Sequence, residues 1–230
     1  MLWEGTLATI YITFLSSLLA YVAGLPLGVL LVVTSKVGVH PIVWLNKLLG
    51  FIVNILRSVP FLILLIAVLP LTRAIIGTTI GTKATVVPLF IASFPFVARL
   101  VEASLIEVNE GVIEAAWSMG STPFQIIYKV LIPEALPSLI NGAAIAVTTI
   151  LSYSAMSGIV GGGGLGDIAI RYGYHRYETD IMFLTVIELV VIVQIIQAIG
   201  ERWAKGSDKR LKLVAGRGLF GLGRAPWAGE

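Results

Sequence analysis

The chain contains no cysteine, which excludes disulfide bonds and thiolate metal ligands. Its two histidines, His40 and His175, lie far apart in sequence in predicted loops, so a histidine metal pair is not expected. Charge is also scarce, since only 13% of the 230 residues are charged whereas 57% are hydrophobic. A soluble domain of this composition would expose large apolar patches and aggregate. The composition therefore indicates an integral membrane protein built as one domain.

Long apolar stretches are abundant, and each meets the requirement of about 20 residues for crossing the hydrocarbon core. There are five of them: Thr6–Val33, Leu48–Leu71, Ala84–Ile106, Pro137–Val160 and Met182–Trp203. The first follows Glu4 rather than a basic region and is long, so an uncleaved helix is favoured over a signal peptide. The sequence therefore predicts an all-α membrane protein with about five transmembrane helices.

The basic residues predict the orientation of these helices through the positive-inside rule. With the N-terminus outside, the outer side receives only Arg73, Lys83, Arg171 and Arg176. The inner side then receives Lys36, Lys47, Arg57, Arg99, Lys129, Arg202, Lys205, Lys209, Arg210, Lys212, Arg217 and Arg224. We therefore expect an external N-terminus, a cytoplasmic segment at 107–136 and a cytoplasmic C-terminus. The net charge of +3 is explained by membrane topology, and no nucleic-acid partner is expected.

The last residues, 205–230, are basic and rich in glycine, with too little apolar material for a core. This composition predicts a disordered or surface-lying tail held near anionic lipid by its lysines and arginines. The membrane domain is accordingly expected at residues 1–204.

Five polar or small residues inside the spans have structural interpretations. Arg57 is expected to extend toward the cytoplasmic side. Arg99 and Glu102 are three residues apart and are expected to pair on one helical face. In "GLPLG" (24–28), two glycines one turn apart predict close packing between helices.

The predicted cytoplasmic stretch "EAAWSMGSTPFQIIYKVLIPEALP" (114–137) is too polar and too interrupted to span a membrane. Helical spacing gives a first apolar stripe at Val112, Ala115, Ala116 and Met119. Gly120 is expected to end this helix in a left-handed cap, and Thr122 with Pro123 to begin the next. A second stripe, ended by Pro133, follows at Phe124, Ile127, Tyr128 and Leu131. The pattern predicts two short amphipathic helices joined at an elbow.

This arrangement of Glu114-Ala115-Ala116, Gly120 and Val130-x-Ile132-Pro133 resembles the "EAA" loop of ABC importer permeases. Val130 and Ile132 depart mildly from the isoleucine and leucine usual in that family. The resemblance implies that the loop is a coupling helix seated in a groove of a cytoplasmic ATPase. The implied coupling residues are Glu114, Ala115, Ala116, Met119, Gly120, Ser121 and Pro133. The alternative is a helix pair that merely lies on the lipid surface.

The resemblance extends to "LRSVPFLILL" (56–65), "MGSTPFQIIYKVLIPEALP" and "YSAMSGIVGGGGLGDIAIRYGY", which are similar to permeases of methionine ABC importers over roughly residues 3–203. It implies the type I importer permease fold in a bacterial inner membrane, and transport of L- and D-methionine. The implied partners are a second copy of the chain, two ATPase subunits and an extracytoplasmic substrate-binding protein. ATP-Mg would bind the ATPase partner, and this chain would hold no cofactor.

Two groups are candidates for a translocation path. The fourth span carries a mixture of polar and apolar side chains that suits a small amphiphilic ligand, at Ser152, Tyr153, Ser154, Met156 and Ser157. Ordinary hydrogen bonding between helices explains that cluster equally well. Glu188, near the middle of the last span, is expected to face protein or a hydrated cavity, because a carboxylate facing lipid is costly. We expect it to bond a hydroxyl of Thr148–Ser157, either on the path or as a packing contact.

Other functions fit the sequence less well. A permease for another small amino acid or related solute is the nearest alternative. A secondary transporter would need internal repeats and coupled intramembrane charges, and only Glu188 is a clear mid-span ionisable group. "GGGGLGD" (161–167) contains the Gly-x-Gly-Asp of intramembrane aspartyl proteases, but a second aspartate at membrane depth is missing. No P-loop sequence occurs, so the chain is expected to be a non-catalytic subunit whose ATPase is a partner.

Overall fold

A computed structural model describes residues 1–207, and this part of the chain folds into helices without strands. Within these residues four helices are long and apolar enough to cross a membrane, and a bent pair of helices makes a fifth when it is counted as one span. The four are α1 (Leu2–Val33), α4 (Thr82–Ile106), α8 (Leu136–Met156) and α10 (Thr179–Ser207). The prediction of about five spans is therefore confirmed.

The second span is a broken helix, so the expectation of one continuous helix over Leu48–Leu71 is wrong. It consists of α2 (Val43–Ser58) and α3 (Phe61–Ile76), which meet at an angle of 103°. Between them Val59 is extended, with φ −81° and ψ 125°, and Pro60 follows. Proline disfavours a helical conformation in the residue before it and has no N–H to donate, which explains the break.

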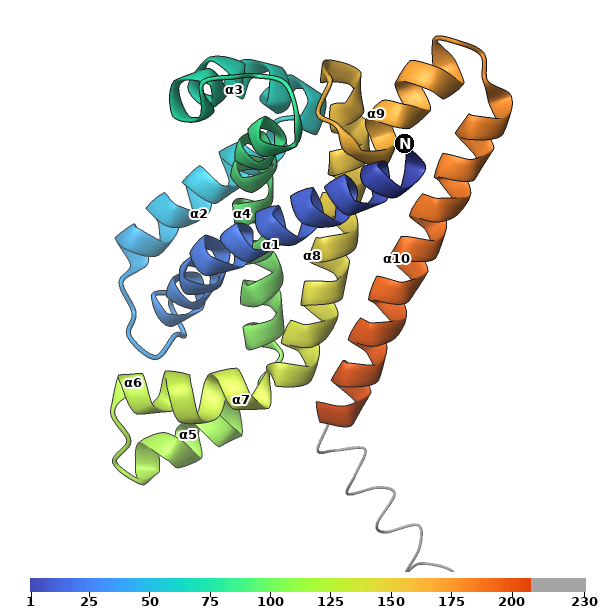
Figure 1. The fold of residues 1–230 in the computed structure, drawn as a ribbon. Coiled ribbons are helices and arrows are strands. Elements are labelled where there is room, and N and C mark those ends of the chain that lie inside the picture. The colour runs from blue at the N-terminus through green and yellow to red at the C-terminus, as the bar shows by residue number, and fades with distance from the viewer. Residues whose placement is uncertain (208–230) are drawn as a thin grey trace, which may run out of the picture.

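The elements at the two ends of the molecule have different characters (Figure 1). The short helices α5 (Glu110–Ser118), α6 (Pro123–Ile126) and α7 (Ile132–Glu134) lie together at one end. The N-terminus and α9 (Gly164–Ile168) lie at the other end, and α1 runs obliquely between the two across α4 and α8. α10 runs beside α8.

The core between α1 and α4 depends on two glycines. A Cβ added to Gly24 would lie 2.8 Å from the Phe94 carbonyl oxygen, and one added to Gly28 would lie 2.6 Å from that of Ala98. Around this contact, buried Ala20, Val97 and Val101 join a cluster that extends to α7 and α8. The close packing predicted from "GLPLG" is confirmed, because only glycine lets the two backbones approach so closely.

Arg99 fastens α2 to α4 through a polar network. Its guanidinium lies 2.5 Å from the Glu102 carboxylate on the same helix, which confirms the predicted pair. The same guanidinium donates to the Gly50 carbonyl oxygen at 3.2 Å and to Asn54 Oδ1 at 2.8 Å. A charge in an apolar span is tolerated when it is paired and hydrogen-bonded in this way.

The glycine-rich turn after α8 packs inside the chain. It comprises η2 (Ser157–Val160), α9 and η3 (Ala169–Tyr174), with positive φ at Gly161, Gly163 and Gly164. Thr9 Oγ1 accepts a hydrogen bond from the Leu165 N–H at 2.8 Å, and Thr85 Oγ1 donates to the Gly162 carbonyl at 2.9 Å. These glycines therefore serve close packing onto α1 and α4.

The last helix is longer than predicted, because α10 continues past Trp203 to Ser207. The first three residues of the expected tail are therefore helical. The rest of the predicted disordered tail, residues 208–230, lies outside the described residues.

Candidate functional site

The first helix of the elbow, α5, turns a different face to the protein than its apolar stripe suggests. Asn109 caps its start by accepting a hydrogen bond from the Gly111 N–H at 2.8 Å. Of the predicted stripe only Ala116 is buried, and Ile113 packs beside it on the core. Ala115 and Met119 are exposed, as is Glu114. Most side chains of the predicted stripe therefore do not pack on the rest of the chain.

The elbow itself forms as predicted. Gly120 has φ +77°, its N–H donates to the Trp117 carbonyl, and the Ser121 N–H donates to the Ala116 carbonyl, which closes the helix with a left-handed cap. Thr122 and Gln125 then form a reciprocal capping box with Pro123 in the first turn of α6. Space beside Gly120 is open, since an added Cβ would have no atom within 4 Å. The elbow is thus exposed in this chain.

The second helix of the elbow does not end at Pro133, contrary to the prediction. It runs from α6 through a π-helical turn, η1 (Ile127–Leu131), and then through α7, which contains this proline. In the wider turn the Ile132 N–H donates to the Ile127 carbonyl. Of the predicted second stripe Leu131 is buried whereas Phe124 and Tyr128 are exposed, and Ile126, which lies outside that stripe, is buried.

As a result, the elbow carries apolar side chains that no described residue covers. Met119 is 79% exposed and Phe124 is 75% exposed, and the Phe124 ring stacks on that of Tyr128 with centroids 6.5 Å apart. We define the elbow surface as the exposed Val112, Trp117, Met119, Phe124 and Tyr128. It lies at the end of the molecule opposite the N-terminus (Figure 1). Helical spacing placed four of these five residues, all but Trp117, on the predicted apolar stripes.

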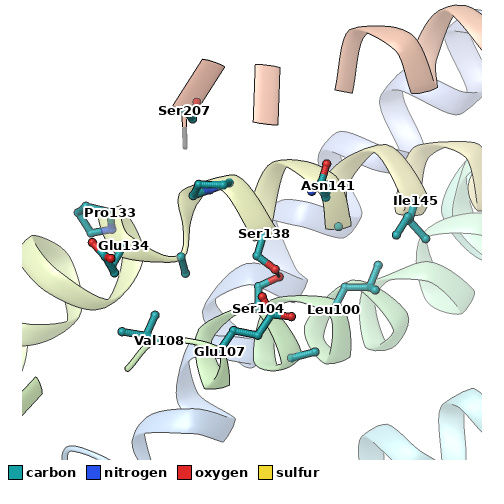
Figure 2. A pocket seen from close by; sticks show the side chains of 14 residues that line it. Leu100, Ser104, Glu107, Val108, Pro133, Glu134, Ser138, Asn141, Ile145 and Ser207 are labelled. Carbon is teal, nitrogen blue, oxygen red and sulfur yellow. Dashed lines mark hydrogen bonds between the residues drawn. The ribbon is translucent and has the colours of Figure 1, made fainter. Parts of the chain in front are cut away.

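A cavity of about 530 Å³ lies where the elbow joins the long helices (Figure 2). Its walls come from the end of α4, from α7, from the first half of α8 and from Ser207. Figure 2 shows Glu134 beside Pro133 and Glu107 beside Ser104, and Ser138 Oγ donates to Ser104 Oγ at 3.2 Å. Exposed Pro133 borders the same cavity. A shift of the elbow relative to α4 and α8 would therefore change the shape of this cavity.

The predicted path cluster on α8 divides between buried and exposed positions. Ser154 and Ser157 are buried, and their hydroxyls donate to the Leu151 and Ser154 carbonyls of the same helix. Ser152 and Met156 are exposed, with the Ser152 hydroxyl bonded to the Thr148 carbonyl. The bonds between helices that formed the alternative interpretation are not found for these three serines. Tyr153 alone borders a hollow, described below.

Glu188 faces protein, as predicted, but its partner differs from the one expected. Its carboxylate accepts a hydrogen bond from the hydroxyl of Thr6 on α1. Thr185, one turn earlier, is fully buried and bonds to carbonyls of its own helix. The contact with α1 favours the packing interpretation, and a role on the path stays a prediction.

Known proteins resemble the chain over nearly its whole length. Residues 24–213 match the family described as "Binding-protein-dependent transport system inner membrane component". A Vibrio cholerae protein described as "Probable D-methionine transport system permease protein MetI" is 53% identical over 210 residues, covering 91% of this chain and 93% of the relative. The "D-methionine transport system permease protein MetI" of Escherichia coli K12 is 48% identical over 161 residues, covering 69% and 74%.

Solved structures show the same fold. A chain in a structure described as inward-facing conformations of the MetNI methionine ABC transporter matches with a TM-score of 0.89 and 45% identity, covering 91% of this chain and 97% of that one. A chain of an amino acid ABC transporter, 21% identical with a TM-score of 0.73, covers 89% and 92%. The second likeness supports the fold alone. With a family match across most of its residues, this chain belongs to the binding-protein-dependent transport system inner membrane components and is a permease of the ABC importer type.

Proposed function

We propose that this chain is the transmembrane permease of an ATP-driven importer that moves methionine, in its L- and D-forms, into the cytoplasm. The identity of 53% with a relative named for D-methionine transport, across 91% of this chain, carries the proposal. The likeness to a methionine ABC transporter structure supports it. In this role the chain provides the path, and a partner ATPase provides the energy.

The proposed orientation places the N-terminus outside and the elbow in the cytoplasm. The unequal distribution of lysine and arginine supports it through the positive-inside rule. The elbow and the N-terminus lie at opposite ends of the molecule, as this topology requires (Figure 1). The permease domain in this proposal is residues 1–204, with the coupling loop at 107–136.

The elbow surface is the proposed contact with the ATPase. A monomer that exposes a compact apolar patch of this kind generally uses it for a partner. Glu114, Ala115 and Gly120 lie beside the patch and are exposed with it, so a groove can approach the backbone closely. In the same proposal Ala116 acts from inside, by fixing α5 on the core.

The complete importer is proposed to contain two copies of this chain, two ATPases and an external substrate-binding protein. Five spans are few to enclose a path, and a two-fold pair encloses one between its subunits. α10 buries only Thr185 and Ala204 within a single chain, so much of its apolar surface is free for lipid or for the second copy.

The proposal is tested by reconstituting the permease with its ATPase and binding protein in liposomes. We expect ATP-dependent uptake of labelled L- and D-methionine, and a native mass that corresponds to two permeases and two ATPases. Uptake of a different amino acid in preference to methionine would refute the substrate. Uptake without an ATPase, driven by an ion gradient, would refute the class of transporter.

The coupling role of the elbow is tested by Gly120→Asp, with Gly77→Asp as its matched control. Both glycines have positive φ, +77° and +83°, and both have open space beside them. The left-handed penalty of about 1 kcal/mol is therefore shared, and only Gly120 lies on the proposed interface. A carboxylate buried there without a partner should lower uptake by about tenfold or more and weaken co-purification of the ATPase. Equal uptake in the two variants would contradict the coupling role.

A further inference from the structure

A second, smaller hollow lies at the break between α2 and α3. It has a volume of about 210 Å³, smaller than the pockets of about 300–1,000 Å³ that hold drug-sized ligands and suited to one amino acid. Its walls come from both sides of the break, from α4 and from the end of α8. The lining residues are Leu56, Arg57, Val59, Phe61, Leu64, Ala92, Phe96 and Tyr153.

Arg57 is the single charged residue of this lining, and its guanidinium has no hydrogen-bond or ion-pair partner within residues 1–207. In Arg99, the other arginine of this region, both Nη atoms are bonded, to Glu102, Asn54 and the Gly50 carbonyl. Structural anchoring therefore accounts for Arg99 and leaves Arg57 unexplained.

Arg57 also lies far from the Val43 end of α2, which the proposed topology places on the cytoplasmic side. α2 begins at Val43, and Arg57 follows after 14 residues, about 21 Å further along the helix. An arginine side chain does not cover that distance. Arg57 instead lines the hollow at the break. The break between α2 and α3 lies in the half of the molecule that faces away from the elbow (Figure 1).

The break also leaves backbone groups that need polar surroundings. The carbonyl of Leu56 would bond the N–H of residue 60, which proline lacks. The carbonyls of Arg57 and Ser58 would need the N–H groups of residues 61 and 62, which start a helix turned by 103°. None of these carbonyls accepts a backbone bond elsewhere in the described chain. Such groups occur at membrane depth where they border protein or a water-filled cavity, and not lipid.

The rest of the lining is apolar and aromatic. The rings of Phe61 and Tyr153 are stacked in parallel, with centroids 4.4 Å apart and an angle of 4° between them. Leu64 and Phe96 continue this apolar wall. One free guanidinium beside such a wall matches a molecule with a carboxylate at one end and an apolar side chain at the other. A guanidinium binds a carboxylate through two parallel hydrogen bonds, and a thioether packs well against aromatic rings.

We propose that Arg57 binds the α-carboxylate of the amino acid during translocation, while Phe61 and Tyr153 contact its apolar side chain. The inference rests on the proposed function, since it assigns a binding site to the substrate named there. The hollow is then a transient binding site that the amino acid occupies after it leaves the binding protein. Loss of charge at Arg57 should slow transport without impairing the ATPase.

The test uses the complete importer in liposomes, with Arg57→Gln, Arg57→Lys and the control Arg73→Gln. Arg73 is an exposed arginine at the end of α3 that does not line the hollow. Losing a charged hydrogen bond typically changes affinity by about tenfold or more, so Arg57→Gln should lower uptake by about that factor at limiting methionine. Arg57→Lys should retain part of the uptake. Basal ATPase activity and assembly should match the control.

A second readout is binding of labelled methionine to the permease–ATPase complex without the binding protein. Unlabelled methionine should compete in the wild type, whereas methioninol, which lacks the carboxylate, should not. Arg57→Gln should remove this difference, and a purely structural role would leave it intact. Wild-type uptake in Arg57→Gln, or a defect confined to vesicles of anionic lipid, would overturn the inference. Failure of the wild type to import methionine would overturn the proposed function instead.

Discussion

Replacing Gly28 by alanine should loosen the contact between α1 and α4 by an amount that the structure allows us to estimate. The new Cβ would lie 2.6 Å from the Ala98 carbonyl oxygen and 2.7 Å from Val101 Cβ, whereas ordinary contact begins at 3.4 Å. The helices must therefore separate by several tenths of an ångström, or Ala98 and Val101 must shift. Overpacking of this kind costs about 1–3 kcal/mol. The change also removes a helical glycine, which contributes up to about 1 kcal/mol in the opposite direction.

Gly50→Ala is the matched control, because it changes the same residue type within α2. Its added Cβ would lie 3.6 Å from the nearest atom, the Arg99 Nη2, which is ordinary contact. The helix-propensity gain is then common to both variants, and the difference in stability isolates the steric cost of about 1–3 kcal/mol. Unfolding of both variants in detergent, followed by tryptophan fluorescence, measures this difference. Equal stability of the two variants would refute the packing argument.

Two further predictions concern polar contacts between helices. Glu188→Leu removes the acceptor of the Thr6 hydroxyl and should destabilise the protein by about 0.6–2 kcal/mol. Glu188→Gln keeps an acceptor and should retain normal uptake. Lost uptake in a stably folded Gln variant would show that ionisation of Glu188 matters. Arg99→Met should lower the free energy of unfolding by about 1.5–3 kcal/mol, because Glu102 loses its partner. Lys205→Met removes an exposed ion pair and should change the unfolding midpoint little. A smaller loss for Arg99→Met than for Lys205→Met would contradict the anchoring role.

The elbow could be predicted from the sequence, whereas the break in the second span could not. Gly120 and Thr122 act through their own backbone and side-chain geometry, so their roles can be read without knowledge of the fold. A proline alone does not predict where a helix ends, because Pro88 and Pro95 lie inside α4 without ending it. Pro60 ends α2, and neighbouring helices determine which prolines are accommodated.

The apolar stripes of the elbow do not match the side chains that are buried within the chain. Periodicity identifies a face but cannot say whether the chain itself or another molecule covers it. Phe124 lies on the predicted stripe and is exposed, whereas Ile126 lies outside the stripe and is buried. The π-helical turn at Ile127–Leu131 adds to this difference. Its backbone hydrogen bonds join residues five apart, so the side chains after it no longer follow the 3.6-residue period. Likewise, Thr6 and Glu188 are 182 residues apart, a pairing that spacing alone does not reveal.

The elbow surface also has a consequence for the fate of a newly made copy. In the proposed complex the ATPase covers Met119, Phe124 and Tyr128, so a permease that meets no ATPase would keep these side chains exposed. Chaperones and proteases continuously triage proteins that expose such surface. We therefore expect unpartnered copies to be removed by quality control, so that the supply of ATPase sets the number of permeases that persist. Subunit stoichiometry would then follow from the same apolar side chains that are proposed to dock on the ATPase, without a separate regulator of synthesis.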